Sequence, residues 1–307
     1  MLYISEQQVL QALTMPDALR LVEQSFRQFA EGSAVNHPRK RLILPGGSIL
    51  HYMAGGNPEY FGIKVYSSHP KTGAHFTFLL YRAADGAPLA NIEANHLGQI
   101  RTGAASGVAT KFLAREDADV LGIIGSGFQS LTQVEAISRV RKLREIRVWS
   151  RKPERRAEFA RHCAERFGLN ARATDTAREA VEDAGIVVTA TGAKEPVLES
   201  AWISRGAHIN AMGSNWTIKR ELPTDLVLDK ADIVTVDSVE DGHLESGDLV
   251  IPMRDRPGIE FPAREICEVI AGSKPGRTSP DQITIFKSNG LAIQDVAVAG
   301  FLYEALK

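Results

Sequence analysis

The amino-acid sequence predicts an α/β protein that combines a Rossmann-type, doubly wound parallel sheet domain with a second, discontinuous α+β domain. Three observations lead to this prediction. The chain has 307 residues, which exceeds the usual size of a single domain. Strand-like apolar runs alternate with helical segments from Asp119 onward, as they do in parallel βαβ units. Residues 41–94 instead carry short β-type runs separated by Gly, Pro and Asp, which indicates a mainly antiparallel sheet.

The elements of the first domain begin with an amphipathic helix. Thr14 is a suitable N-cap, Asp17 lies in the first turn, and apolar residues recur at helical spacing until Gly32. The β-type runs of residues 41–94 come next. Residues 97–114 then have helical character and lead into the second domain, and residues 291–306 are helical again. If this last helix packs back on the first domain, that domain is discontinuous.

The second domain shows the alternation of a parallel sheet. Its short apolar runs are bounded by turn residues, as buried parallel strands are. Strands are expected at 120–125, 145–150, 184–191, 207–212, 233–236 and 284–287, with helices at 130–140 and 154–167.

Charge and cysteine content exclude several kinds of partner and site. The chain has 36 Lys and Arg against 37 Asp and Glu, so its net charge of −1 gives no overall attraction to nucleic acid or anionic membrane. Its 2 cysteines cannot build a disulfide framework or a multi-cysteine metal site. The sequence shows no signal peptide and no run of about 18 apolar residues, and its histidines lack metal-ligand spacing. We therefore expect a cytoplasmic protein with no nucleic-acid or membrane partner and no catalytic metal.

A glycine-rich segment between the first parallel strand and the following helix predicts a dinucleotide site. Gly125 permits a tight turn, and Gly127 lets a pyrophosphate approach the backbone at the helix N-terminus. Ser130 stands where a third glycine is usual, which weakens the motif. A GxG after a strand can also be a simple turn, but the following βα units favour cofactor binding. The expected contacts are Gly125, Ser126, Gly127, Phe128 and Gln129.

The end of the second parallel strand distinguishes the two nicotinamide dinucleotides. An NAD enzyme places an acid there, whereas an NADP enzyme places an Arg near the 2′-phosphate. This sequence has Ser150, Arg151 and Lys152 and no acid. Because a guanidinium binds phosphate through two hydrogen bonds, NADP(H) is favoured, with NAD(H) as the alternative. A basic, solvated helix start is the competing interpretation, since Arg155 and Arg156 follow.

Several segments, in the same order along the chain, together resemble the ornithine cyclodeaminase/mu-crystallin family. They are GIKVYS at 62–67, QIRTGAASGVAT at 99–110, GIIGSGFQS at 122–130, INAMGSN at 209–215, ESGDL at 245–249 and FKSNGLAIQD at 286–295. The resemblance implies a homodimer. It also implies that residues 1–115 and 292–307 bind substrate and carry the subunit interface, and that residues 116–291 bind the dinucleotide. Family members include cyclodeaminases, alanine dehydrogenases, ketimine and imino-acid reductases, and NADPH-binding crystallins.

The resemblance also implies which residues bind substrate and cofactor. Arg41, Lys64 and Arg101 look like the family's group for the substrate carboxylate. Arg39 is an alternative to Arg41, because the stretch HPRKR leaves the register open. Converging cations of this kind need an anionic partner, which a carboxylate would supply. The cofactor contacts that the resemblance implies are Thr102, Arg151, Thr191, Gly192, Met212 and Ser288.

Two departures from the family pattern concern the chemistry. Where cyclodeaminases carry an acid two residues before the motif methionine, this chain has His51, two before Met53. Where they carry a second acid two residues after the glycine of the INAxG segment, it has Asn215 after Gly213, and we expect Asn215 to contact substrate. Cyclodeamination needs acids to manage protons and to hold the distal ammonium. Their replacement argues against a diamino-acid substrate and for a simpler hydride transfer.

We therefore expect an NADPH-dependent reductase of an imine next to a carboxylate, or an amino-acid dehydrogenase that proceeds through that imine. Arg41 and Arg101 would clamp the carboxylate, and Lys64 would hydrogen-bond near the reacting nitrogen. His51, with an ordinary pKa of about 6.5, would be either a general acid at neutral pH or a structural strand histidine. The alternatives are a cyclodeaminase and a crystallin-like protein that binds NADPH without turnover.

Overall fold

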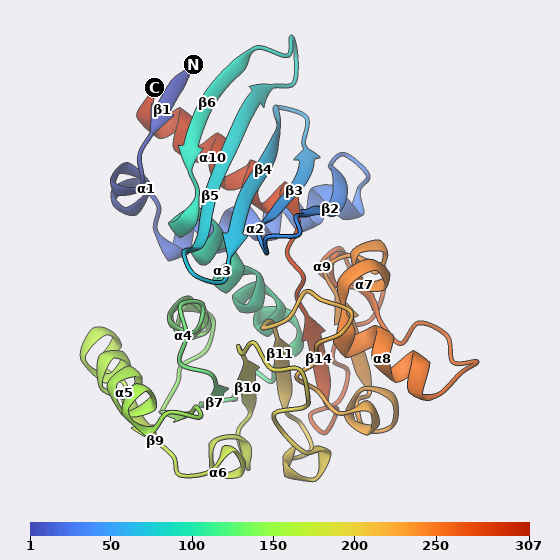
Figure 1. Ribbon diagram of the computed structural model, residues 1–307. Coiled ribbons are helices and arrows are strands. Elements are labelled where there is room, and N and C mark those ends of the chain that lie inside the picture. Colours follow the sequence, from blue (N-terminus) through green and yellow to red (C-terminus); the bar gives the residue numbers. More distant parts are fainter. The chain divides into compact units, whose positions relative to one another are not determined.

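The computed structural model describes residues 1–307 and divides into two compact units (Figure 1). Unit 1 consists of Met1–Ala104 and Gly290–Lys307, and unit 2 consists of Ala105–Asn289. The division lies inside helix α3 (Asn95–Leu113), earlier than the boundary at residue 115 proposed from the sequence. The sequence pattern shows where this continuous helix ends, but it does not show that the two halves of the helix belong to different units.

Unit 1 contains a six-stranded sheet that is antiparallel except at one edge. Its spatial order is β1–β6–β5–β4–β3–β2, and only β1 and β6 pair in parallel. The strands are β1 (Leu2–Ile4), β2 (Val35–Ile43), β3 (Ile49–Gly56), β4 (Tyr60–His69), β5 (Gly73–Arg82) and β6 (Pro88–Glu93). Strands β2 to β6 pair in sequence order, which confirms the mainly antiparallel sheet predicted for residues 41–94.

The helices of unit 1 cover one face of this sheet. Helix α10 (Ala292–Leu306) packs against α2 (Met15–Ala30) and strands β2 to β5, and α1 (Glu6–Ala12) precedes α2. Figure 1 shows α10, in red, lying across the strands although it is the last element of the chain. As predicted, the Thr14 side chain caps α2, accepting a hydrogen bond from the Asp17 N–H at 3.4 Å.

Unit 2 contains an eight-stranded sheet in which every pair is parallel. Its spatial order is β13–β12–β14–β11–β10–β7–β8–β9. The strands are β7 (Val120–Ile124), β8 (Glu145–Trp149), β9 (Asn170–Ala173), β10 (Ile186–Thr189), β11 (His208–Ala211), β12 (Ile233–Val236), β13 (Arg264–Glu265) and β14 (Thr284–Lys287). The order reverses between β7 and β10, and such a switch point is where sheets of this kind bind ligands, outside the carboxyl ends of the strands.

The central strands of this sheet are buried on both faces. Every residue of β7, β10, β11, β12 and β14 is buried, as in parallel sheets with helices on both sides. Val120 and Ile124 belong to one apolar cluster, and Leu121 and Ile123 belong to another. Because successive strand residues point to opposite faces, these clusters fill the two sides of the sheet.

The helices of unit 2 connect these strands. They are α4 (Ser130–Val140), α5 (Pro153–Phe167), α6 (Ala177–Val181), α7 (Val239–Glu245), α8 (Gly247–Asp255) and α9 (Ile266–Ile270). The sequence did not predict β9 and β13, because both are short edge strands without an apolar run. None of the helices in the structure combines the length and the hydropathy needed to cross a bilayer.

Candidate functional site

The turn after β7 has the backbone geometry that the glycine motif predicts. Gly125 has a φ of +120°, and its N–H donates to the carbonyl oxygen of Trp149 at 2.8 Å. A Cβ at Gly125 would lie 2.4 Å from the carbonyl oxygen of Ala190, so any side chain there would collide with the loop after β10. Cβ atoms at Gly127 and Gly192 would meet no atom within 4 Å. The turn is therefore closed at Gly125 and leaves open room beside Gly127 and Gly192.

A cavity of about 1270 Å³ lies at the carboxyl ends of β7, β8 and β10. It is larger than most small-molecule pockets, which occupy roughly 300–1,000 Å³, and it therefore suits an extended ligand. The hydroxyl groups of Ser126 and Ser150 hydrogen-bond at 2.9 Å and join the loops after β7 and β8. Together with the N-terminus of α4, which favours an anion, these features fit a dinucleotide. The predicted cofactor residues that line the cavity are Gly125, Ser126, Gly127, Ser150, Arg151, Lys152, Thr191 and Gly192.

The other predicted cofactor residues lie outside this lining. Phe128 is 55% exposed and faces a smaller neighbouring cavity beside α5. Gln129 is the N-cap residue of α4. Met212 and Ser288 directly follow β11 and β14. Thr102 belongs to unit 1, where its hydroxyl donates to a carbonyl oxygen one turn earlier in α3 at 2.7 Å.

The wall of the cavity near the end of β8 carries positive charge. Arg151, Lys152 and Arg155 all line it and are exposed. Arg156, in contrast, pairs with Asp175 at 3.2 Å. No carboxylate lies within ion-pair distance of Arg151, Lys152 or Arg155, so this part of the cavity attracts anions.

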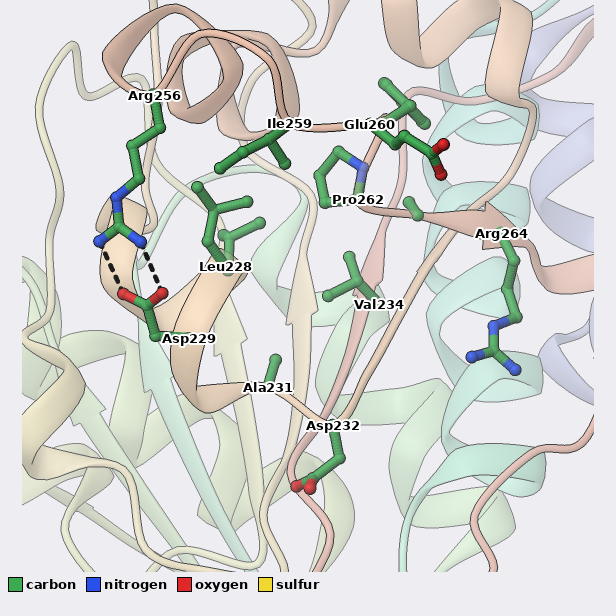
Figure 2. Close-up of a pocket in the computed structure, with 13 residues that line it drawn as sticks. Leu228, Asp229, Ala231, Asp232, Val234, Arg256, Ile259, Glu260, Pro262 and Arg264 are labelled. Atoms are coloured by element: carbon green, nitrogen blue, oxygen red, sulfur yellow. Dashed lines mark hydrogen bonds and ion pairs between the residues drawn. The ribbon is translucent and has the colours of Figure 1, made fainter.

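A second cavity, of about 480 Å³, lies near β12 and β13 at one edge of the same sheet (Figure 2). Its lining includes Leu228, Val234 and Ile259, and none of the predicted site residues. Figure 2 shows the Arg256 guanidinium facing the Asp229 carboxylate, to which it donates two hydrogen bonds of 2.5 and 2.7 Å. The guanidinium already has its anion, so we assign no function to this cavity.

Two of the predicted substrate residues meet at one buried carboxylate in unit 1. Lys64 on β4 and Arg101 on α3 both donate to Oδ1 of Asp295 on α10, at 2.8 Å from Lys64 Nζ and 3.1 Å from Arg101 Nε. The three residues are 2%, 5% and 0% exposed, respectively. Burial lowers the pKa of Lys64 to about 8, the charges of Arg101 and Arg39 add to this effect, and Asp295 opposes it. The sequence predicted Lys64 and Arg101 but missed Asp295.

Strand β2 resolves which arginine lies beside this cluster. Arg39 is 8% exposed, its Nη2 lies 3.5 Å from the Met53 sulfur, and its charge lowers the pKa of Lys64. Arg41 and Arg39 both lower the pKa of His51. The pairing of β2 with β3 is irregular between His37 and Lys40, and such a break cannot be read from alternation alone. Arg39, the alternative to Arg41, thus contacts Met53, which pairs with Lys64 across β3 and β4, and Arg41 stays a predicted substrate contact.

His51 on β3 contacts side chains of the neighbouring strand β4. Its ring stacks on Tyr66 with 4.2 Å between centroids, and its Nε2 is 2.9 Å from the Ser68 hydroxyl oxygen. Burial lowers the pKa of His51 to about 4, and the charges of Arg41 and Arg39 add to the effect. A pKa of about 4 leaves the ring neutral at pH 7, which favours the structural alternative for His51 over the general acid.

Comparison with known proteins decides the family. The model of the ornithine cyclodeaminase/mu-crystallin family matches residues 2–307. The chain belongs to this family. An alanine dehydrogenase from Archaeoglobus fulgidus is 36% identical over 310 residues, which cover 99% of this chain and 94% of the relative. A Δ1-pyrroline-2-carboxylate reductase from Bacillus cereus is 40% identical over 256 residues, which cover 80% and 77%.

Solved structures of relatives have the same fold. The Δ1-pyrroline-2-carboxylate reductase of Thermococcus litoralis, in complex with NADH and L-proline, has a TM-score of 0.92 at 35% identity. The alignment covers 99% of this chain and 97% of that one. An archaeal alanine dehydrogenase dimer with bound NAD has a TM-score of 0.93 at 34% identity and covers 99% and 95%.

In this member of the ornithine cyclodeaminase/mu-crystallin family, neither residue at the two cyclodeaminase acid positions carries a negative charge. His51 is a neutral, stacked ring in unit 1. Asn215 follows β11 in unit 2 and is half-buried. Unit 1 does hold a buried charged cluster, in which Lys64 and Arg101 donate to Asp295.

A second residue that the sequence did not indicate, Glu221, joins two loops at the carboxyl ends of the parallel strands. Glu221 is fully buried, and its carboxylate accepts hydrogen bonds from the N–H and hydroxyl of Thr191 and from the N–H of Gly213, each at 2.7 Å. Burial raises the pKa of Glu221, with the charge of Asp248 adding to the effect and that of Lys287 opposing it. Glu221 therefore ties the loop after β10 to the loop after β11. Its immediate sequence, Arg220-Glu221-Leu222, resembles that of an ordinary surface glutamate.

Proposed function

We propose that this protein is an NAD(P)H-dependent oxidoreductase that reduces a C=N bond next to a carboxylate, or oxidises the corresponding amine. One observation supports this proposal most directly: Lys64 and Arg101 both donate a hydrogen bond to the same oxygen of Asp295. Two buried cations on one carboxylate leave a positive charge, which a further anion would offset. A substrate carboxylate is such an anion. The relative that holds NADH and L-proline, a cyclic amine next to a carboxylate, supports this assignment.

In the proposed reaction, two residues of unit 1 have different roles. When bound, the reduced nicotinamide supplies a hydride to the imine carbon. The C=N π bond is lost as the carbon gains this hydride and the nitrogen gains a proton. Arg101 binds the carboxylate, and the Lys64 ammonium donates the proton. With a pKa of about 8, Lys64 is mostly protonated at pH 7 but releases its proton more readily than an ordinary lysine.

A substrate panel tests the proposed reaction. We expect oxidation of NADPH with Δ1-pyrroline-2-carboxylate and with 2-keto acids in the presence of ammonia or methylamine. Δ1-Pyrroline, which lacks the carboxylate, is the matched control and should react far more slowly. Equal rates with the two cyclic imines would contradict the role of the cationic cluster. Conversion of ornithine to proline and ammonia without net NADPH formation would indicate a cyclodeaminase, and cofactor binding without any turnover would indicate a binding protein.

We also infer that NADP(H) is preferred over NAD(H). Three observations support this preference: Arg151 lines the cavity directly after Ser150, no acid stands at that position, and no carboxylate neutralises Arg151, Lys152 or Arg155. A 2′-phosphate would supply the missing negative charge, and the Ser150 hydroxyl would add a hydrogen bond.

We further propose that two copies of the chain pair through the sheet of unit 1. Helix α10 covers one face of this sheet, while the other face presents Leu50, Tyr52 and Phe61 at 39%, 37% and 41% exposure. The Phe61 ring stacks on Tyr81 of the neighbouring strand with 5.3 Å between centroids. A contiguous apolar face of this kind is typical of a subunit interface, and the alanine dehydrogenase relative is a dimer.

Charges placed on that face should prevent pairing. We expect the double variant Tyr52→Lys, Phe61→Asp to sediment as a monomer at concentrations where the wild type is a dimer. The matched control is Leu244→Asp, which places a charge at a 57% exposed leucine on α7 of unit 2 and should leave the dimer intact. If the dimer dissociates in Leu244→Asp but not in the double variant, the interface does not lie on this face of unit 1.

A further inference from the structure

The carboxylate of Asp295 is the only acidic group in hydrogen-bond contact with both Lys64 and Arg101. It lies in the first turn of α10 and is fully buried. Its Oδ1 accepts from Lys64 Nζ at 2.8 Å and from Arg101 Nε at 3.1 Å, while its Oδ2 is buried without a hydrogen-bond partner. The neighbouring Gln294 accepts a further bond from Arg101 Nη1 at 3.1 Å. The first turn of α10 therefore holds two side chains that come from β4 and α3.

The surroundings of Lys64 leave Asp295 as its only opposing charge. Arg101 on α3 and Arg39 on β2 both repel the ammonium, and the Phe76 ring on β5 lies 5.6 Å from Nζ. Asp295 is the largest influence that favours the protonated amine. Burial alone would raise the pKa of Asp295, but the charges of Arg101 and Lys64 outweigh burial and lower it. Asp295 is therefore ionised at neutral pH, where Lys64 is mostly protonated.

We propose that Asp295 is the positioning residue of the substrate site, because one of its oxygens fixes Lys64 and Arg101 relative to each other. This proposal rests on the proposed function, in which Lys64 donates the proton and Arg101 binds the carboxylate. Since the two donors share one acceptor atom, displacing either side chain disturbs the other. Close packing adds a further restraint, because a Cβ at Gly98 would lie 2.8 Å from Lys64 Nζ. Asp295 also holds the proton on Lys64 that the reaction consumes.

Two substitutions separate these contributions. Asp295→Asn keeps an oxygen that can accept both hydrogen bonds but removes the charge. Asp295→Glu keeps the charge but moves it by one methylene. If Asp295 acts through Lys64, the first change should alter the pH dependence of turnover, and the second should mainly raise the KM for the imine.

The pH profile of kcat/KM with Δ1-pyrroline-2-carboxylate tests the role of the charge. In the wild type, kcat/KM should fall as pH rises through about 8, where Lys64 loses its proton. In Asp295→Asn we expect this descending limb to move at least one pH unit lower, with a loss of kcat/KM at pH 8 of about fivefold or more. A descending limb at the same pH in Asp295→Asn and the wild type would overturn the proposal.

A matched control distinguishes this effect from loss of any buried ion pair. Glu145 at the start of β8 likewise accepts from two arginines, with 3.0 Å to Arg147 Nε and 2.8 Å to Arg172 Nε. Glu145→Gln should lower thermal stability without moving the pH profile. If Asp295→Asn does not fold, Asp295→Glu provides the test. The descending limb of its kcat/KM profile should stay near pH 8, while its KM for the imine rises at least tenfold. An unchanged KM would contradict the positioning role.

A second measurement does not depend on activity. In protein with ¹³C-labelled lysine, the Lys64 Cε signal, assigned with a Lys64→Arg variant, should titrate near pH 8 in the wild type and lower in Asp295→Asn. If the wild type reduces no imine, the proposed function fails, but this titration still tests Asp295. If the wild type is an active reductase and both the titration and the pH profile are unchanged in Asp295→Asn, only the role of Asp295 fails.

Discussion

Replacing Lys64 with Ala should reduce kcat for imine reduction by about 10²- to 10⁴-fold, the usual contribution of a general acid. The dissociation constant for NADPH should stay the same, because Lys64 lies in unit 1 and the predicted dinucleotide cavity is built from unit 2. The variant should fold, since Asp295 keeps its hydrogen bond to Arg101 at 3.1 Å. Steady-state kinetics and a fluorescence titration with NADPH measure the two quantities separately.

Lys71→Ala is the matched control for this variant. Lys71 is an exposed lysine in the turn between β4 and β5, and its removal should change neither quantity. If Lys64→Ala weakens NADPH binding as much as it slows turnover, Lys64 has a structural role. If turnover survives within a few-fold of the wild type, the proton reaches the imine nitrogen by another route.

Arg151→Asp should shift the ratio of kcat/KM values from NADPH toward NADH by roughly 10- to 100-fold, the effect of losing charge-assisted hydrogen bonds. The new carboxylate would repel the 2′-phosphate of NADPH and could accept hydrogen bonds from the ribose hydroxyls of NADH. Most of the change should appear in the KM for NADPH, because Arg151 lines the cavity at the end of β8 and does not belong to the cluster around Lys64.

Arg156→Ala is the matched control for this variant, because Arg156 lies in the first turn of α5, close to Arg151 in the sequence. Arg156 already pairs with Asp175 at 3.2 Å, so its loss should leave the NADPH-to-NADH ratio unchanged. A preference that is unaltered in Arg151→Asp would refute the phosphate role and favour a solvated helix start at residues 151–156.

The fold could be predicted where the local pattern and the tertiary environment agree. Strands such as β7 and β10 are buried on both faces, so their apolar runs stand out in the sequence. The helical character of residues 97–114 likewise predicted α3. The sequence did not indicate that the boundary between the units lies inside this helix. The edge strands β9 and β13 carry alternating or charged residues, and pairing with a neighbouring strand defines them rather than composition.

The candidate site could be predicted only in part, because packing decides which distant residues meet. The motifs that contain Lys64 and Arg101 pointed to both residues, yet Asp295 is 231 positions from Lys64 and is brought there by the packing of α10 on the sheet. Glu221 reaches Thr191 across 30 positions. His51 was expected to titrate near neutrality, but the sequence does not reveal its burial or the nearby charges of Arg41 and Arg39.

The split of unit 1 around unit 2 affects the order in which a growing chain can fold. All of unit 2, residues 105–289, is synthesised before residues 290–307. Because domains generally fold as units, the first 104 residues cannot complete their unit until the last helix has been synthesised, whereas unit 2 has all of its strands by residue 289. Asp295 arrives with that helix. Lys64 and Arg101 therefore gain their shared carboxylate only when the last helix of the chain is in place, and the proposed substrate site would be among the last parts of the protein to mature.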